Sequence, residues 1–150
     1  MLPELHSDPN NSNSRIGSLQ FEGREVALRI NPDDATAEEC IASALKAVLA
    51  LQEIDSKAKD TAARCMLSNY NDNWRHYSRA GEEGIFVDVH DPELTASDFK
   101  ARLSMTALEA LGTSCYTIFY NDDRMFAGHS IVITSFDGLQ FSDSFAELFG

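Results

Sequence analysis

Apolar and polar residues alternate along residues 24–30, where Val26, Leu28 and Ile30 are separated by charged or small residues. A period of two is typical of a strand with one buried face. Ile16, Leu19 and Phe21 precede the dipeptide Glu22-Gly23, so the two segments predict a β-hairpin near the start of the chain. Residues 1–14 are rich in Asn, Ser and Pro and have no apolar period. We therefore expect a flexible N-terminal arm over 1–14 and a single domain over 15–150.

Helical spacing follows the hairpin. Thr36 and Glu39 form a predicted capping box, and apolar residues recur at intervals of three and four from Ile41 to Leu49. The helical pattern extends toward Tyr70, either as one long broken helix or as a second helix that begins near Asp55. A further pair, Thr95 and Asp98, predicts the start of a short helix.

The rest of the chain favours strands. Residues 69–84 are polar and rich in Asn and Gly, which predicts a loop, and residues 85–89 predict a strand with Phe86, and Val87 and Val89 with it, buried. Three β-prone runs at 104–111, 113–121 and 129–136 are joined by short turns, and residues 142–150 suggest a closing helical turn. This order predicts an α+β fold: an antiparallel sheet of five or six strands with two helices, or one long broken helix, on one face.

The net charge of the chain limits the classes of partner that we expect it to bind. The formal net charge is −12, and residues 81–150 contain 12 of the 24 acidic residues but only three of the 12 basic ones. Phosphate binding needs clustered Lys and Arg, so we expect no nucleic acid and no membrane surface as partner. A negative surface attracts a basic protein. We expect such a surface to include five acidic residues: Glu82, Glu83, Asp88, Asp91 and Glu93.

The cysteines and the chain start bear on location. Three cysteines, an odd number with no C-x-x-C spacing, suggest buried thiols in a reducing compartment. No signal peptide pattern begins the chain and no apolar run is long enough for a membrane span, which predicts a cytoplasmic protein.

Candidate catalytic groups are sparse. Asp88 and His90 share one face of a predicted strand, and His129 or His76 would have to complete a metal site through the fold. Ser130 follows Gly128, but the second Gly of the G-x-S-x-G pattern is absent. We therefore expect no enzyme, no cofactor and no metal, with a metal-dependent hydrolase that uses His90, His129 and Asp88 as the alternative.

The segment around His129 also has a structural interpretation. In a strand His129 shares a face with Ile131 and Ile133, and a buried imidazole needs a hydrogen-bond partner such as Asp122, Asp123 or Tyr120. Gly128 permits a bulge or a close backbone approach. We expect these residues to stabilise a hairpin, and Trp74 to close the end of the helices. The predicted structural group is Trp74, Asp122, Asp123, Phe126, Gly128 and His129.

The same residues carry a family resemblance. The run Phe126-Ala127-Gly128-His129-Ser130-Ile131-Val132, with Asp122 and Asp123 before it and Gly138 after it, resembles a family of small bacterial proteins grouped with the immunity proteins of polymorphic toxin systems. The resemblance implies an α+β domain without enzymatic activity that binds a partner. It favours an immunity-type protein that neutralises a basic toxin, such as a nuclease. A homodimeric housekeeping protein is a further alternative.

Overall fold

The computed structural model describes residues 2–150. Its strands are β1 (His6–Asp8), β2 (Asn11–Phe21), β3 (Arg24–Asn31), β4 (His76–Ala80), β5 (Phe86–His90), β6 (Ser104–Leu111), β7 (Cys115–Asn121), β8 (Ser130–Ser135) and β9 (Ser144–Phe149). Its α-helices are α1 (Ala37–Leu49), α2 (Leu51–Asn69) and α3 (Ala96–Ala101). The short turns are the π-helical η1 (Tyr70–Trp74) and the 3₁₀ turns η2 (Glu82–Gly84) and η3 (Gly138–Gln140).

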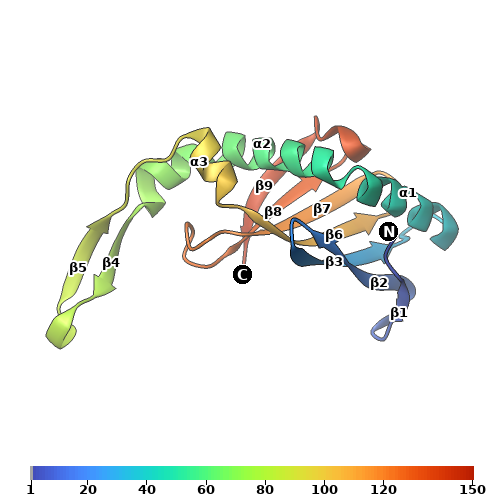
Figure 1. Ribbon diagram of the computed structural model, residues 1–150, viewed down its shortest axis with the longest axis horizontal. Helices are drawn as coiled ribbons and strands as arrows, with labels where there is room; N and C mark the ends of the chain where they lie inside the picture. The colour runs from blue at the N-terminus through green and yellow to red at the C-terminus, as the bar shows by residue number, and fades with distance from the viewer. Residues whose placement is uncertain (1) are drawn as a thin grey trace.

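Seven strands form one sheet in the order β1-β2-β3-β6-β7-β8-β9, and β4 and β5 form a separate two-stranded sheet. The α-helices lie over one face of the large sheet (Figure 1). The α+β prediction is confirmed, and so is the hairpin of β2 and β3 around Glu22-Gly23. The sheet has more strands than the five or six predicted, because two strands lie in segments without a clear strand pattern, β1 at one edge and β9 at the other.

One pair in the sheet is parallel. β3 and β6 run side by side in the same direction, and every other neighbouring pair is antiparallel. A parallel pair needs a long connection. Residues 32–103 provide it, and they carry α1, α2, the β4–β5 hairpin and α3 over the sheet.

The core lies between the helices and the covered face of the sheet. Every second residue of β3, Val26, Leu28 and Ile30, is at most 1% exposed, as the alternation predicts. The capping box of Thr36 and Glu39 is present at the start of α1, and Ala44, Ala47, Ile54 and Ala58 are among the buried helical residues that face these strands. The helical region is broken at Ala50, and α2 begins at Leu51, four residues before Asp55, the expected start of a second helix. The helical region therefore consists of two consecutive helices, α1 and α2.

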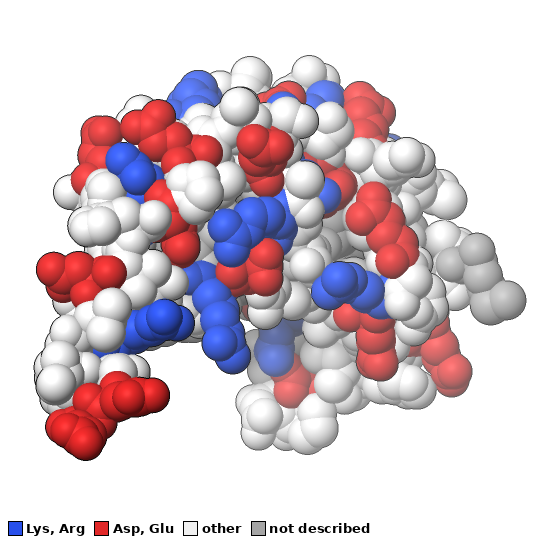
Figure 2. All heavy atoms as spheres, turned by 60° about the vertical axis from the view of Figure 1, so that its left-hand side comes forward, with Lys and Arg blue, Asp and Glu red and all other residues white. Residues whose placement is uncertain are grey.

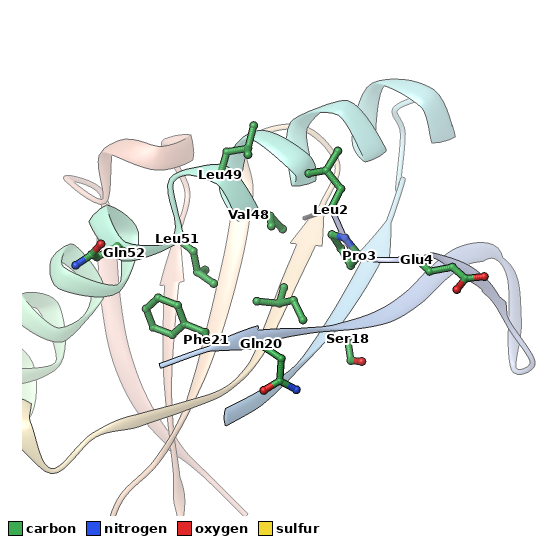
Figure 3. Close-up of a pocket in the computed structure, with 11 residues that line it drawn as sticks. Leu2, Pro3, Glu4, Ser18, Gln20, Phe21, Val48, Leu49, Leu51 and Gln52 are labelled. Atoms are coloured by element: carbon green, nitrogen blue, oxygen red, sulfur yellow. The ribbon is translucent and has the colours of Figure 1, made fainter. Parts of the chain in front are cut away.

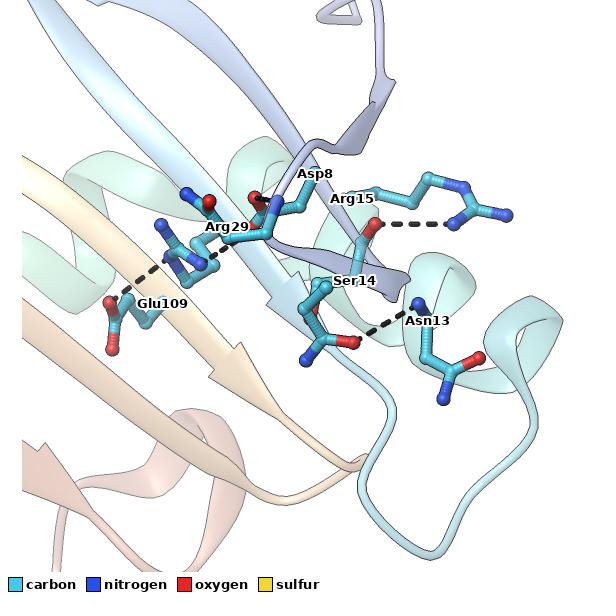
Figure 4. Close-up of polar contacts among 8 residues, drawn as sticks. Asp8, Asn13, Ser14, Arg15, Arg29 and Glu109 are labelled. Atoms are coloured by element: carbon cyan, nitrogen blue, oxygen red, sulfur yellow. Dashed lines mark hydrogen bonds and ion pairs between the residues drawn. The ribbon is translucent and has the colours of Figure 1, made fainter.

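The range predicted as a flexible arm contains β1 and the first part of β2. Arg29 Nη1 lies 2.5 Å from Asp8 Oδ2, whose side chain is 2% exposed, and Arg29 Nε lies 3.7 Å from Glu109 Oε1 on β6 (Figure 4). Backbone pairing to Ile16 and Arg15 completes the attachment of β1. Strands held by backbone bonds and one ion pair need no apolar period, so the hydrophobic pattern does not reveal them.

The C-terminal segment is a strand and not the helical turn that the sequence suggested. β9 pairs antiparallel with β8, and its residues alternate between the two faces of the sheet. Ala146 and Leu148 pack toward the core, while Phe145 and Phe149 lie on the uncovered face. Apolar residues lie on both faces of this strand, so its sequence shows no clear period of two.

A polar group lies within the core beneath α2. The hydroxyl of Tyr120, which is fully buried, donates to Asp55 Oδ1 at 2.7 Å, and Lys59 Nζ lies 3.0 Å from Asp55 Oδ2. Burial and the nearby Asp55 carboxylate raise the pKa of Tyr120. The hydroxyl therefore stays protonated and satisfies a carboxylate that is only 5% exposed.

We expect Tyr120→Phe to lower the free energy of unfolding by about 1–2 kcal/mol at pH 7, because Asp55 loses a buried donor. The folded-state pKa lies above the unfolded value of about 10, so the stability linked to this proton is complete below pH 10 and is lost as the pH rises further. The gap between wild type and variant should therefore shrink by up to roughly 1.4 kcal/mol per pH unit above pH 10. Urea unfolding at pH 7 and pH 10.5 measures both effects, and a gap independent of pH would contradict the assignment.

Candidate functional site

The most exposed ordered element is the β4–β5 pair, residues 76–90, called here the projecting hairpin. Its five cross-strand pairs join His76 with His90 at the base and Ala80 with Phe86 at the tip, and in residues 2–150 it pairs with no other strand. It extends away from the sheet and the helices (Figure 1). All of its strand residues are exposed except Val89, which is half-buried. A lone two-stranded hairpin is marginally stable in water, so the order of this element depends on how its base is held.

Hydrogen bonds close the base of the hairpin. Asp91 N donates to Arg75 O at 2.9 Å, and the Arg75 guanidinium donates to Asp91 O at 2.9 Å and to Asn71 O at 2.7 Å. Asn71 also exchanges two side-chain bonds with the backbone of Leu94, at 2.9 and 3.0 Å. The chain therefore enters and leaves the hairpin at one fixed point.

An aromatic cluster anchors this base to the domain. The Phe126 ring is fully buried, and its centroid lies 5.9 Å from that of Tyr70, 5.5 Å from Trp74 and 6.2 Å from Phe99, all edge to face. Trp74 is half-buried and also packs against His129, at 6.0 Å between centroids. The cluster joins η1, α3 and the loop before β8.

The carboxylate of Asp122 organises that loop. It is 3% exposed and accepts from three backbone N–H groups: Arg124 at 3.0 Å, Phe126 at 2.7 Å and Gly128 at 3.1 Å. Gly128 has φ +84°, a conformation that favours glycine. Asp123 accepts from Arg102 Nε at 2.9 Å on the surface. These bonds hold Phe126 in the cluster.

His129 does not occupy the position that the sequence suggested. It precedes β8, is half-buried, and its Nδ1 lies 2.6 Å from Phe126 O. The expected bond to Asp122, Asp123 or Tyr120 is absent, because the loop carries His129 past the end of the strand. In this loop the stabilising carboxylate is that of Asp122, and His129 packs at its edge beside Trp74.

The two faces of the projecting hairpin differ in chemistry. Residues that alternate along a strand share a face, so His76, His90 and Asp88 lie on one side, with Asp88 Oδ1 accepting from Ser78 Oγ at 2.8 Å. His76 Nδ1 and His90 Nδ1 lie 2.7 Å apart. The other face carries Tyr77, Arg79, Val87 and Val89.

The five acidic residues expected to form a binding surface all lie on the hairpin or at its base. Glu82 and Glu83 are exposed in η2 at the tip, Asp88 is on β5, and Asp91 and Glu93 follow it. Residues 76–93 hold these five acids and one base, Arg79, a net charge of −4. Figure 2 shows acidic side chains at the tip of the hairpin and higher along it. Within residues 2–150 only Glu93 of the five has an ion-pair partner, Arg75 at 3.6 Å.

Two predictions for this region are wrong. Phe86 and Val87 were expected to be buried and are 73% and 43% exposed, because β5 pairs only with β4 and never reaches the core. Residues 76–80, expected to be loop, form β4. Two short β-prone runs separated by a Gly-containing turn were the available signal. Ile85 and Tyr77, 65% and 47% exposed, extend the apolar surface.

The residues of the metal-hydrolase alternative are not all brought together. His90 and Asp88 share a face of the hairpin, and His90 contacts His76. His129 lies elsewhere, in the loop before β8, where its ring contacts Phe126 O. In the part of the chain that the structure describes, no group of three or more His, Cys, Asp or Glu side chains is arranged to hold a metal ion.

The thiols differ from the expectation of uniform burial. Cys40 is buried and burial raises its pKa, Cys115 is half-buried with its pKa raised in the same way, and Cys65 is exposed on α2. Cys40 Sγ donates to Gly112 O at 2.8 Å.

None of the described helices has the length and apolar character needed to cross a membrane.

One groove in the described residues lies away from the hairpin. This groove of about 620 Å³ runs between β2 and the junction of α1 and α2, and it is lined mainly by apolar residues such as Leu2, Phe21 and Leu51. Ser18 and Gln20 point away from these apolar side chains (Figure 3). Polar groups that converge on a reacting atom mark a catalytic pocket, and this groove is not built in that way.

Residues 5–141 match a family described as uncharacterised and conserved in bacteria, DUF2262. The chain belongs to this family. The matched range of DUF2262 runs from the residue before β1 to the residue after η3 and includes the whole projecting hairpin. No curated protein and no solved structure matches the chain.

Two side-chain contacts in this DUF2262 chain were not predicted, because they depend on how β4 pairs with β5. The contacts of His76 with His90 and of Ser78 with Asp88 arise from the register of β4 against β5. A hairpin assignment for residues 76–90 would have predicted both, because cross-strand neighbours follow from the turn.

Proposed function

We propose that this protein is a non-enzymatic binding protein of the immunity type, which neutralises a basic protein toxin by docking the projecting hairpin on it. The observation that carries the proposal is the isolation of the hairpin. Its strands have two free edges and two uncovered faces, and both apolar and acidic side chains are exposed on it.

The composition of the hairpin fits a partner with a basic surface. Exposed Phe86, Ile85 and Tyr77 offer the aromatic and aliphatic groups that anchor interfaces, and acidic residues flank them at the tip and the base. Such an arrangement combines apolar contact with electrostatic attraction. A free strand edge can also add a strand from the partner.

The test uses the purified product of the neighbouring gene as the candidate toxin. Glu82→Lys with Glu83→Lys should weaken binding roughly tenfold or more, about 1.4 kcal/mol, because two attractive charges become repulsive. The matched control is Glu25→Lys with Asp34→Lys, which makes the same charge change at exposed positions on the body. Isothermal titration calorimetry at two salt concentrations measures both pairs.

Equal weakening by both double variants would contradict docking through the hairpin, because net charge alone would then explain the effect. Binding that neither variant alters would contradict it as well. Sedimentation of the free protein tests the homodimer alternative: a dimer that Phe86→Ser separates would assign the hairpin to self-association in place of a toxin. The net charge of −12 opposes such pairing of two copies.

A further inference from the structure

Two histidines face each other across the base of the projecting hairpin. His76 and His90 are direct cross-strand partners, their ring centroids are 4.9 Å apart at an interplanar angle of 64°, and both side chains are exposed. Their Nδ1 atoms converge to 2.7 Å. At this distance the two ring nitrogens are close enough to form a hydrogen bond, and each is also a possible metal ligand.

The structure assigns a further role to this pair: we propose that His76 and His90 together bind one divalent transition-metal ion, with water in its remaining positions. Imidazole nitrogen is a preferred ligand of zinc, copper and nickel. At metal–nitrogen distances of about 2.0–2.1 Å, two nitrogens on a tetrahedral ion lie roughly 3.3 Å apart. Opening the present 2.7 Å contact to that spacing takes a small rotation of two exposed rings.

The surroundings favour a cation. Asp88 lies on the same face two residues before His90, and its carboxylate is already oriented by Ser78. Arg79 lies on the opposite face, and the Arg75 guanidinium is turned toward Asn71, Asp91 and Glu93. The Asp88 carboxylate is thus a negative group on the face of the pair, where it would attract a positive ion.

The site would act as a clamp and not as a catalytic centre. It has two protein ligands, one on each strand, and it lies where the hairpin leaves the domain. An ion that binds only the paired strands adds its binding free energy to the stability of the hairpin. The clamp requires no partner, so its test is independent of the proposed toxin.

Zinc titrated into EDTA-dialysed protein tests the proposal. Calorimetry should show one ion bound per chain, and His76→Ala or His90→Ala should each weaken binding on the order of tenfold or more. The matched control is His6→Ala, which removes another exposed histidine and should leave zinc binding unchanged. Circular dichroism confirms that each variant is folded, as expected for substitutions at exposed positions.

Hydrogen exchange gives a second measurement on the unmodified chain. Saturating zinc should slow exchange of amides in residues 76–90 and leave those of the large sheet unchanged. Zinc binding that survives both histidine substitutions, or that is lost with Cys65→Ser, would overturn the proposal. So would a wild-type protein that binds no zinc, or zinc binding without added protection in the hairpin.

Discussion

Phe126→Ala should lower the free energy of unfolding by about 3–5 kcal/mol. The Phe126 ring is 0% exposed and is enclosed by Tyr70, Trp74 and Phe99. Removing it leaves a cavity among three elements that pack against its ring: η1, α3 and the loop before β8. The loss is large because the rings are held by different segments, which limits how far the site can collapse.

Guanidinium unfolding followed by circular dichroism measures the loss, and Trp74 fluorescence should shift to the red as water reaches its ring. Phe149→Ala is the matched control. Phe149 is 65% exposed on the uncovered face of the sheet, so we expect a change within about 0.5 kcal/mol. A loss below about 1 kcal/mol for Phe126→Ala would show that the cluster does not anchor the hairpin base.

Asp122→Ala should cost about 3 kcal/mol, because three backbone N–H groups lose the carboxylate that accepts their hydrogen bonds. The loop they form has several residues with positive φ, among them Asp123, Arg124 and Ala127. A backbone conformation with positive φ is unfavourable for residues other than glycine and persists only when other contacts hold it. Asp122 supplies those contacts.

The control compares the same substitution, Asp to Asn, at the adjacent positions 122 and 123. Asp122→Asn removes a charge and one of two accepting oxygens at a buried site, and Asp123→Asn removes a surface ion pair with Arg102. We expect Asp123→Asn to cost less than about 1 kcal/mol and Asp122→Asn clearly more. Thermal unfolding of the two variants compares them, and equal losses would refute the assignment of Asp122 as the organiser of the loop.

The fold class and several elements could be predicted because their signals are local. The alternation of β3, the capping boxes at Thr36 and Thr95, and the turns between β6, β7 and β8 are all found where expected. In each case one face of the element is buried in the core, so the hydrophobic period reports the structure directly.

The missed elements lack that condition. β1 is attached by Asp8 and by backbone bonds, and β4 buries neither face, so no apolar period marks either strand. β5 was predicted as a strand, but its exposure and its pairing with β4 alone were not. The parallel pairing of β3 with β6 depends on how residues 32–103 pack over the sheet, which no short window contains. The five acidic residues were chosen from charge alone, and the structure places them on the hairpin or at its base because they all lie within residues 82–93.

The hydrogen bonds that close the base of the hairpin allow the hairpin and the rest of the domain to change independently. Arg75 O and Asp91 N already form a hydrogen bond, so residues 76–90 can be altered, lengthened or replaced without a break in the bonding of the sheet. Under the proposed function, substitutions in this insert would change which toxin is bound and leave the fold of the scaffold intact. One scaffold could then serve against a series of diverging toxins.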